Sequence, residues 1–213
     1  MLQRFFHIFF PERCRGCRTP GSALCARCIN RIPFADVLPR GTYAVFDYSN
    51  ALVRATVRDL KYHRRSESAR RLAVAALPHI SEYLGNTLQG IGTESLILVP
   101  IPEHVRKETT RGFNQSTLLA TWWKQGLPRS MVTSVLKKVL FTLPQAKLNR
   151  HARLKNVAHT MECTEELTSL NTYIVIDDVT TTGATFDEAR RALRTAGATK
   201  IICIALSHGY IPK

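Results

Sequence analysis

Two adjacent carboxylates, Asp177 and Asp178, are followed by a turn that is rich in hydroxyl groups. Residues 173–176 before them are apolar and predict a buried parallel strand, and ligands bind at the carboxyl ends of such strands. A loop of small residues entering a helix offers backbone N–H groups and a positive dipole end to a phosphate. Carboxylates instead accept hydrogen bonds from sugar hydroxyls. The pattern therefore predicts a sugar-phosphate site with the loop residues Thr180, Thr181, Thr182, Gly183, Ala184 and Thr185.

A second interpretation of this segment is a plain strand–turn–helix, in which the threonines are turn and cap residues. That interpretation explains the hydroxyl groups but gives the paired carboxylates no role. We therefore favour the sugar-phosphate interpretation.

Four of the six cysteines lie near the start of the chain as two Cys-x-x-Cys pairs. Each pair brings two thiolates to one side of a tight turn, and two such turns complete a structural zinc site with no open position for catalysis. Disulfides are the alternative, but no export signal is recognised, and a redox role needs only one pair beside a thioredoxin-like strand. The predicted Zn²⁺ ligands are Cys14, Cys17, Cys25 and Cys28, whereas Cys163 and Cys203 are expected to be small buried hydrophobic residues.

The net charge of +14 is unevenly distributed along the chain. Residues 109–161 contain no acidic residue but nine basic ones. An excess of this kind favours a polyanionic partner, because binding releases counterions from phosphates, although a merely well-solvated surface would also account for it. The predicted nucleic-acid-binding residues are Arg111, Lys137, Lys138, Lys147, Arg150, Arg153 and Lys155.

The length and hydropathy of the chain bear on where it acts. Its 213 residues suit one α/β domain with a small appendage. No apolar run approaches the roughly 20 residues that a membrane-spanning helix needs. The apolar residues at 5–10 do not resemble a signal peptide, and packing on the small module is favoured over contact with a membrane surface. We expect a cytoplasmic protein.

Strands and helices must alternate along the chain to position these groups, which predicts a parallel sheet with helices on both faces. A zinc-binding module is expected over residues 1–38 and the α/β domain over 39–213. The expected strands cover 42–48, 96–102, 132–140, 173–177 and 201–206. The expected helices cover 50–62, 66–84, 115–125, a basic segment near 142–156, and a segment that ends near Gly197. Pro78 should kink or break the second helix, which a loop over 85–92 follows. Trp122 and Trp123 on the third helix are expected in the core.

The acid pair followed by Thr-Gly-Ala-Thr resembles the signature of type I phosphoribosyltransferases, which bind 5-phosphoribosyl 1-pyrophosphate (PRPP) with Mg²⁺. By this resemblance, residues 181–185 would hold the 5′-phosphate, and Asp177 and Asp178 the ribose hydroxyls. The turn over residues 99–102 would take the place of the pyrophosphate loop. Lys61, Arg106 or Arg111 could supply cations, and for Lys61 a solvated surface position is an open alternative.

The motifs in order resemble the ComF family over nearly the whole chain. They are the Cys pairs, Leu60-Lys61-Tyr62, Val99-Pro-Ile-Pro102, Arg111-Gly-Phe-Asn-Gln115, Thr142 with Gln145, Arg153 with Asn156, and the segment from Asp177 to Thr185. The resemblance implies a role in natural competence, in the cytoplasm or at the inner membrane. Its expected partners there are incoming single-stranded DNA, a helicase-like protein and the DNA channel.

Whether the chain turns PRPP over stays open at this point, because the sequence shows neither a nucleobase pocket nor an evident catalytic base. His63 and His104 lie near the right segments, but isolated loop histidines are usually solvated. Three hypotheses therefore compete. They are a PRPP-binding competence protein, a phosphoribosyltransferase of nucleotide salvage, and a nucleic-acid-binding regulator that senses PRPP.

Overall fold

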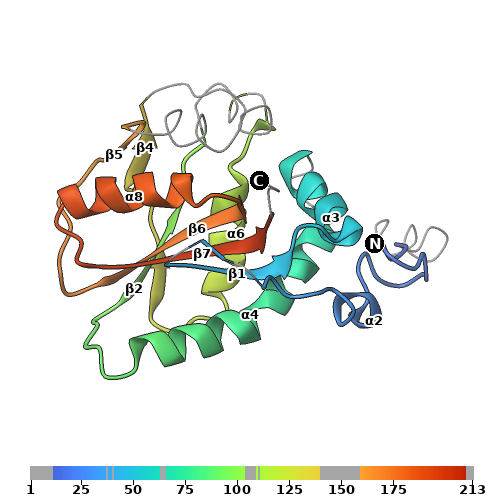
Figure 1. Cartoon of the computed structure of the whole chain (residues 1–213). Helices are drawn as coiled ribbons and strands as arrows, with labels where there is room; N and C mark the ends of the chain where they lie inside the picture. The colour runs from blue at the N-terminus through green and yellow to red at the C-terminus, as the bar shows by residue number, and fades with distance from the viewer. Residues whose placement is uncertain are drawn as a thin grey trace, which may run out of the picture.

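A five-stranded sheet of parallel strands forms the centre of the computed structural model (Figure 1). The structure describes residues 12–36, 38–39, 41–62, 66–103, 109, 111–139 and 159–209. The strand order is β1-β7-β6-β2-β3, and every neighbouring pair is parallel. The strands are β1 (Thr42–Asp47), β2 (Leu96–Pro100), β3 (Ser130–Val132), β6 (Thr172–Thr180) and β7 (Lys200–His208).

The two central strands, β6 and β7, are almost entirely buried because helices cover both faces of the sheet. Such strands carry near-continuous apolar runs, which is why the sequence showed them clearly. One face is covered by α4 (Glu67–Leu88) and α6 (Gln115–Lys124), and the other by α8 (Ala184–Thr195). Helix α3 (Ala51–Tyr62) packs on α4 beside the carboxyl ends of the strands. The predicted parallel sheet flanked by helices is confirmed.

A two-stranded antiparallel sheet lies beside α8 and consists of β4 (Leu136–Lys138) and β5 (Met161–Cys163). The single strand predicted over 132–140 is therefore wrong. Its residues divide between the edge strand β3 and the start of this second sheet, because the chain leaves the main sheet after Val132.

Helix α4 corrects two further predictions. It runs without interruption through Pro78 and continues to Leu88, so the break at Pro78 is wrong, and the loop predicted over 85–92 begins only after Leu88. Six of its apolar residues are buried against the core, and this packing outweighs the low helix propensity of proline and glycine. Ser66 caps the helix by accepting a hydrogen bond from Ala69 N at 3.2 Å.

Of the two tryptophans on α6, Trp123 has the expected core role, and Trp122 packs against the core while only half-buried. Trp123 is fully buried, and its indole Nε1 donates to Ala73 O on α4 at 2.9 Å. Cys203 is fully buried as predicted, but Cys163 is only half-buried, and its thiol donates to Glu165 O. The expected buried role of Cys163 is therefore wrong, because β5 lies in the small outer sheet.

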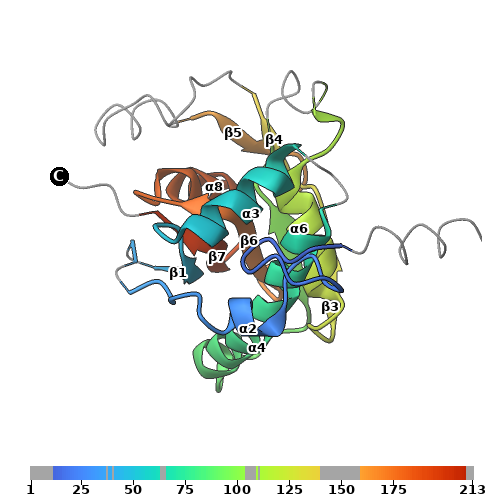
Figure 2. The ribbon, with the colours of Figure 1, turned by 90° about the vertical axis from the view of Figure 1, so that its right-hand side faces the viewer.

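The N-terminal segment packs on α3, with its short helix α2 (Ala26–Ile29) below that helix in Figure 2. Its residues Cys14, Leu24 and Ile32 belong to the same apolar cluster as the inner face of α3. The boundary between residues 1–38 and 39–213 stays a prediction. Among the described residues, no helix combines the length and the apolar character needed to cross a membrane.

Candidate functional site

The acid pair lies within β6, close to its carboxyl end, rather than after it. The strand was expected to end by residue 177, but its pairing with β7 continues to Thr180 opposite His208. As a result, consecutive side chains point to opposite faces of the sheet. Asp177 is half-buried and Asp178 is buried.

Each aspartate is held by a side chain from a different helix. Ser116 Oγ, in the first turn of α6, donates to Asp177 Oδ1 at 3.0 Å, and the backbone N–H of Asp178 donates to the same oxygen at 2.9 Å. Lys61 Nζ, at the end of α3, lies 2.9 Å from Asp178 Oδ2. The sequence analysis missed Ser116, although its position directly after the Arg-Gly-Phe-Asn-Gln motif was a usable signal.

The pKa values of Asp177 and Lys61 are both shifted by their surroundings. Burial, followed by the adjacent charge of Asp178, raises the pKa of Asp177 well above its usual range. The charge of Asp178 raises the pKa of Lys61, against the opposing effect of burial, and keeps this lysine protonated. Lys61 is therefore an ion-pair partner of Asp178 rather than a solvated surface residue, and it offsets one of the two negative charges.

The hydroxyl-rich loop forms a tight turn at the start of α8. Gly183 occupies the N-cap position with φ of +83°, and a Cβ there would come within 3.0 Å of Pro39 Cβ, so glycine is required. Thr182 Oγ1 accepts a hydrogen bond from Ala184 N at 3.4 Å, and the ring of His208 contacts Thr181 O at 3.1 Å. Together with Asp177, the residues 179–186 line a small recess.

Arg111 belongs to a polar clamp on the loop that follows β2. Its Nη1 donates to Glu103 Oε2 at 2.7 Å and to Gln115 Oε1 at 3.3 Å. Asn114 caps α6 and donates through Nδ2 to Ile101 O at 2.9 Å. The motif around Arg111 therefore fixes this loop against α6, and the charge of Arg111 is already partnered by Glu103.

A pocket of about 290 Å³ lies beside this loop, between the carboxyl end of β2, the start of α6 and the strand β4. Two of the predicted nucleic-acid-binding residues, Lys137 and Lys138, line it. The others in the acid-free span, Lys147, Arg150, Arg153 and Lys155, lie outside the described residues, as do the expected basic helix near 142–156, Arg106, His63 and His104.

The four N-terminal cysteines meet in one cluster, and their sulfur atoms all lie within 4.8 Å of one another. Cys25 Sγ is 3.5 Å from Cys14 Sγ and 3.7 Å from Cys17 Sγ. Four sulfurs bound tetrahedrally to zinc at about 2.3 Å would lie about 3.8 Å apart, so the cluster fits a single ion. A Cβ on Gly16 would come within 2.8 Å of Cys28 Sγ, which explains the glycine in the first turn.

The environment of the cluster stabilises at least one thiolate. Burial is the largest influence on Cys14 and opposes ionisation, but N–H groups of Cys17, Cys25 and Gly16 together lower the pKa of Cys14 to about 6. Burial, reinforced by the neighbouring thiols, raises the pKa of Cys28 to about 12. A bound cation would favour ionisation of all four sulfurs.

Comparisons with known proteins find relatives whose names refer to DNA utilization and competence. It is 29% identical over 191 residues to a DNA utilization protein YhgH of Salmonella typhi, covering 88% of this chain and 80% of the relative. It is 28% identical over 177 residues to that of Escherichia coli K12, covering 83% of this chain and 74% of the relative. It is 27% identical over 106 residues to competence protein F of Haemophilus influenzae, covering 49% of this chain and 46% of that protein.

No family model matches the chain. Among solved structures, it is similar to the allosteric regulatory enzyme of purine biosynthesis, with a TM-score of 0.40 and 15% identity over 70% of this chain and 29% of that one. The similarity to the YhgH proteins and to competence protein F confirms the resemblance to the ComF family that the motifs indicated.

Proposed function

We propose that this chain binds PRPP with Mg²⁺ at the acid pair and the loop over 181–185, and that it acts in DNA utilization by handling single-stranded DNA. The DNA role follows the names of its relatives, DNA utilization protein YhgH and competence protein F. The sugar-phosphate role rests on the site itself. A cytoplasmic location and contact with a competence helicase or an inner-membrane DNA channel belong to the same proposal.

The observation that carries the PRPP assignment is that Asp177 lines the recess formed by the loop, while its neighbour Asp178 is held on the same strand by a cation. Ser116 orients Asp177 and Lys61 orients Asp178, so neither carboxylate needs to reorganise when sugar hydroxyls arrive. Gly183 adopts the left-handed conformation that the tight turn needs, and the turn leads directly into the start of α8, where the helix dipole favours a phosphate. This arrangement suits a ribose 5-phosphate unit with two free hydroxyl groups.

The charge balance of the site also favours PRPP. Two carboxylates alone would repel a ligand with several phosphate charges, but Lys61 neutralises one of them. The raised pKa of Asp177 further reduces its negative charge before binding. Mg²⁺ bound with the pyrophosphate group of PRPP would supply the remaining compensation.

Thermal unfolding tests the assignment. PRPP with Mg²⁺ at about 100 times its Kd should add about 2.7 kcal/mol of stability. For a chain of this size, that corresponds to a rise in the melting temperature of about 5–10 °C. The double variant Asp177→Asn with Asp178→Asn should lose this rise. A matched control, Glu162→Gln with Glu166→Gln on the outer sheet and the loop after it, removes the same charge and should keep it.

A double variant that responds to PRPP as the wild type does would remove the site assignment. A separate measurement, pyrophosphate release from PRPP in the presence of a panel of nucleobases, distinguishes turnover from binding alone. Release with one base would favour the salvage-enzyme alternative, whereas a rise in melting temperature without release supports a binding role.

A further inference from the structure

The last three residues of α3 face three different environments, although they form one motif. Leu60 is fully buried in the core, and Lys61 reaches Asp178 in the site. Tyr62 is 66% exposed, which makes it one of the most exposed large hydrophobic side chains that the structure describes. Neither core packing nor the acid pair accounts for Tyr62.

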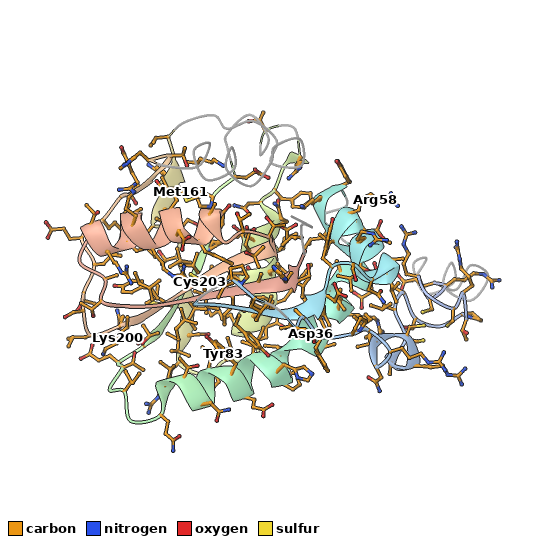
Figure 3. All side chains as sticks on the ribbon, viewed as in Figure 1. Asp36, Arg58, Tyr83, Met161, Lys200 and Cys203 are labelled. Carbon is orange, nitrogen blue, oxygen red and sulfur yellow. The ribbon has the colours of Figure 1, made fainter. Side chains whose placement is uncertain are left out.

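Tyr62 continues an exposed stripe along α3. Arg54 and Arg58 precede it at intervals of four residues and are both exposed, so the three side chains follow one another on the outer side of the helix. Figure 2 shows α3 in front of the sheet on this side of the molecule, and Figure 3 shows Arg58 on its outer surface. The stripe ends where α3 reaches the sugar-phosphate site.

The positive charge of this stripe is not compensated by its neighbours. Asp59, the acidic residue of α3, is paired with Arg15 of the cysteine segment at 3.1 Å. Arg54 donates to the backbone oxygens of Tyr48 and Ser49, which orients its guanidinium but leaves its charge. Within the part of the chain that the structure describes, neither Arg54 nor Arg58 has an acidic partner.

The ring of Tyr62 is itself held in position. Arg111 Cζ lies 5.8 Å from the ring centroid, in a cation–π arrangement, and Arg111 is anchored in turn by Glu103. A fixed, exposed aromatic ring beside two uncompensated arginines has the chemistry that single-stranded nucleic acids require. The arginines bind backbone phosphates and the ring stacks on an unpaired base.

We propose that Arg54, Arg58 and Tyr62 form a binding surface for single-stranded nucleic acid. This inference rests on the DNA-handling part of the proposed function and is independent of PRPP binding. Charge complementarity identifies the partner as a polyanion, and the exposed ring selects a strand with unpaired bases over a duplex. These three residues lie outside the acid-free span over 109–161 that the sequence pointed to, and Arg111 of that span contacts the ring of Tyr62.

Fluorescence anisotropy with labelled oligo(dT) and the full chain tests this surface. Arg54→Gln with Arg58→Gln should weaken binding about tenfold and flatten the salt dependence by about 1–2 units of slope. Tyr62→Ala should weaken binding about 5- to 100-fold, whereas Tyr62→Phe should retain it, because only the ring is needed for stacking. Unlabelled duplex of equal length should compete poorly.

The matched control is Lys124→Gln with Arg194→Gln, which removes two exposed charges at the ends of α6 and α8, at the opposite edge of the sheet. This control should bind within about twofold of the wild type. Binding that is equally strong in the α3 variants, or equally weak in the control, would overturn the inference while leaving the DNA role intact. A wild-type chain that binds no strand even at low salt would remove both the inference and the DNA role, and the PRPP response would still be tested separately.

Discussion

The cysteine cluster and the proposed sugar-phosphate site are held together in opposite ways. All four sulfur atoms come from one short segment, residues 14–28, and the ion that they fit would hold that segment. The acid pair on β6 depends instead on Ser116 from α6 and Lys61 from α3, both distant in the sequence. The first site can therefore be lost by local unfolding, whereas a change in the second is felt by the whole domain. Helix α3 contacts both regions, because its Asp59 pairs with Arg15 of the cysteine segment and its Lys61 pairs with Asp178 of β6.

The largest expected effect comes from removing the cysteines, and it tests whether the cysteine segment is held locally by its ion. Cys25→Ser with Cys28→Ser should abolish zinc binding, and a structural zinc site contributes about 10–16 kcal/mol of apparent binding free energy. Metal analysis should then find no zinc, and limited proteolysis should cut within residues 12–32 while the sheet resists. Because Cys14 and Leu24 share the apolar cluster under α3, the melting temperature should also fall.

Cys163→Ser is the control for this change, since Cys163 lies on the outer sheet and away from the cluster. It should keep one equivalent of zinc and the wild-type proteolysis pattern. Retention of zinc by the double variant would show that the four sulfurs do not share one ion.

The next largest effect concerns the ion pair in the site. Lys61→Met leaves Asp178, which is only 5% exposed, without its cation. Removing one partner of a buried pair costs about 3–5 kcal/mol, measurable by urea unfolding at pH 7. Because the pKa of Lys61 is raised, its stabilising effect is complete below the ordinary lysine pKa of 10.5 and is lost as the pH rises through the raised value.

Adding Asp178→Asn to Lys61→Met should recover most of this loss, since no buried charge is then left unpaired. Zinc content and proteolysis pattern should distinguish the Lys61→Met variant from the cysteine variants. Lys61→Met should lower the stability of the whole domain and leave the zinc content unchanged. Cleavage confined to residues 12–32 in this variant would contradict the division between local and long-range support.

A smaller effect of opposite sign is expected for Asp177. Its pKa is raised mainly by burial, so the ionised carboxylate destabilises the folded protein at neutral pH. Asp177→Asn should therefore raise the melting temperature at pH 7 without PRPP, by about 2–4 °C for each kcal/mol recovered. As the pH falls through the raised pKa, the wild-type carboxyl takes up a proton in the folded state first, so the advantage of the variant should shrink towards pH 4.

Equal melting temperatures of the Asp177→Asn variant and the wild type at pH 7 and at pH 4 would show that burying the ionised carboxylate of Asp177 costs no stability. A rise without PRPP that accompanies a lost response to PRPP would show the exchange of stability for function that ligand sites often make.

The two regions also differ in how far the sequence could predict them. The clustering of the four cysteines was predicted, because their spacing alone brings the sulfurs together. The loop and the acid pair were predicted from a contiguous pattern on β6 as well. The ion pair of Lys61 with Asp178 was not, because it depends on how α3 packs against the sheet, and no local pattern records that distance.

The fold shows the same division. The strands β2, β6 and β7 were predicted because their apolar runs are buried, and β1 from a weak alternation of apolar and polar residues. The short strands β3 and β4 were merged into one, since three residues each carry too little pattern to show where the chain leaves the sheet. The continuation of α4 through Pro78 depends on tertiary packing, which outweighs the local preference.

The smallest expected effect tests the least visible long-range contact. Ser116→Ala removes the hydroxyl that orients Asp177 Oδ1 but leaves the backbone donor at Asp178 in place. Loss of one such hydrogen bond costs about 1 kcal/mol. Because Ser116 acts through Asp177 rather than on the ligand, calorimetric titration should show PRPP binding about fivefold weaker. The pH at which PRPP binding changes should also shift to a higher value, since the carboxylate of Asp177 loses a donor that favours its ionised form.

Ser130→Ala is the matched control, because it also deletes a serine hydroxyl that donates a hydrogen bond, to Leu127 O at 2.6 Å. Ser130 lies at the start of β3, beyond the end of α6 that is opposite to Ser116. It should lose a similar amount of stability and keep both the affinity for PRPP and its pH dependence. Ser116→Thr, which restores a hydroxyl at the same position, should recover part of the affinity. If Ser116→Ala changed stability alone and left the pH profile unmoved, Ser116 would be a packing residue of α6, and the acid pair would be oriented by the strand itself.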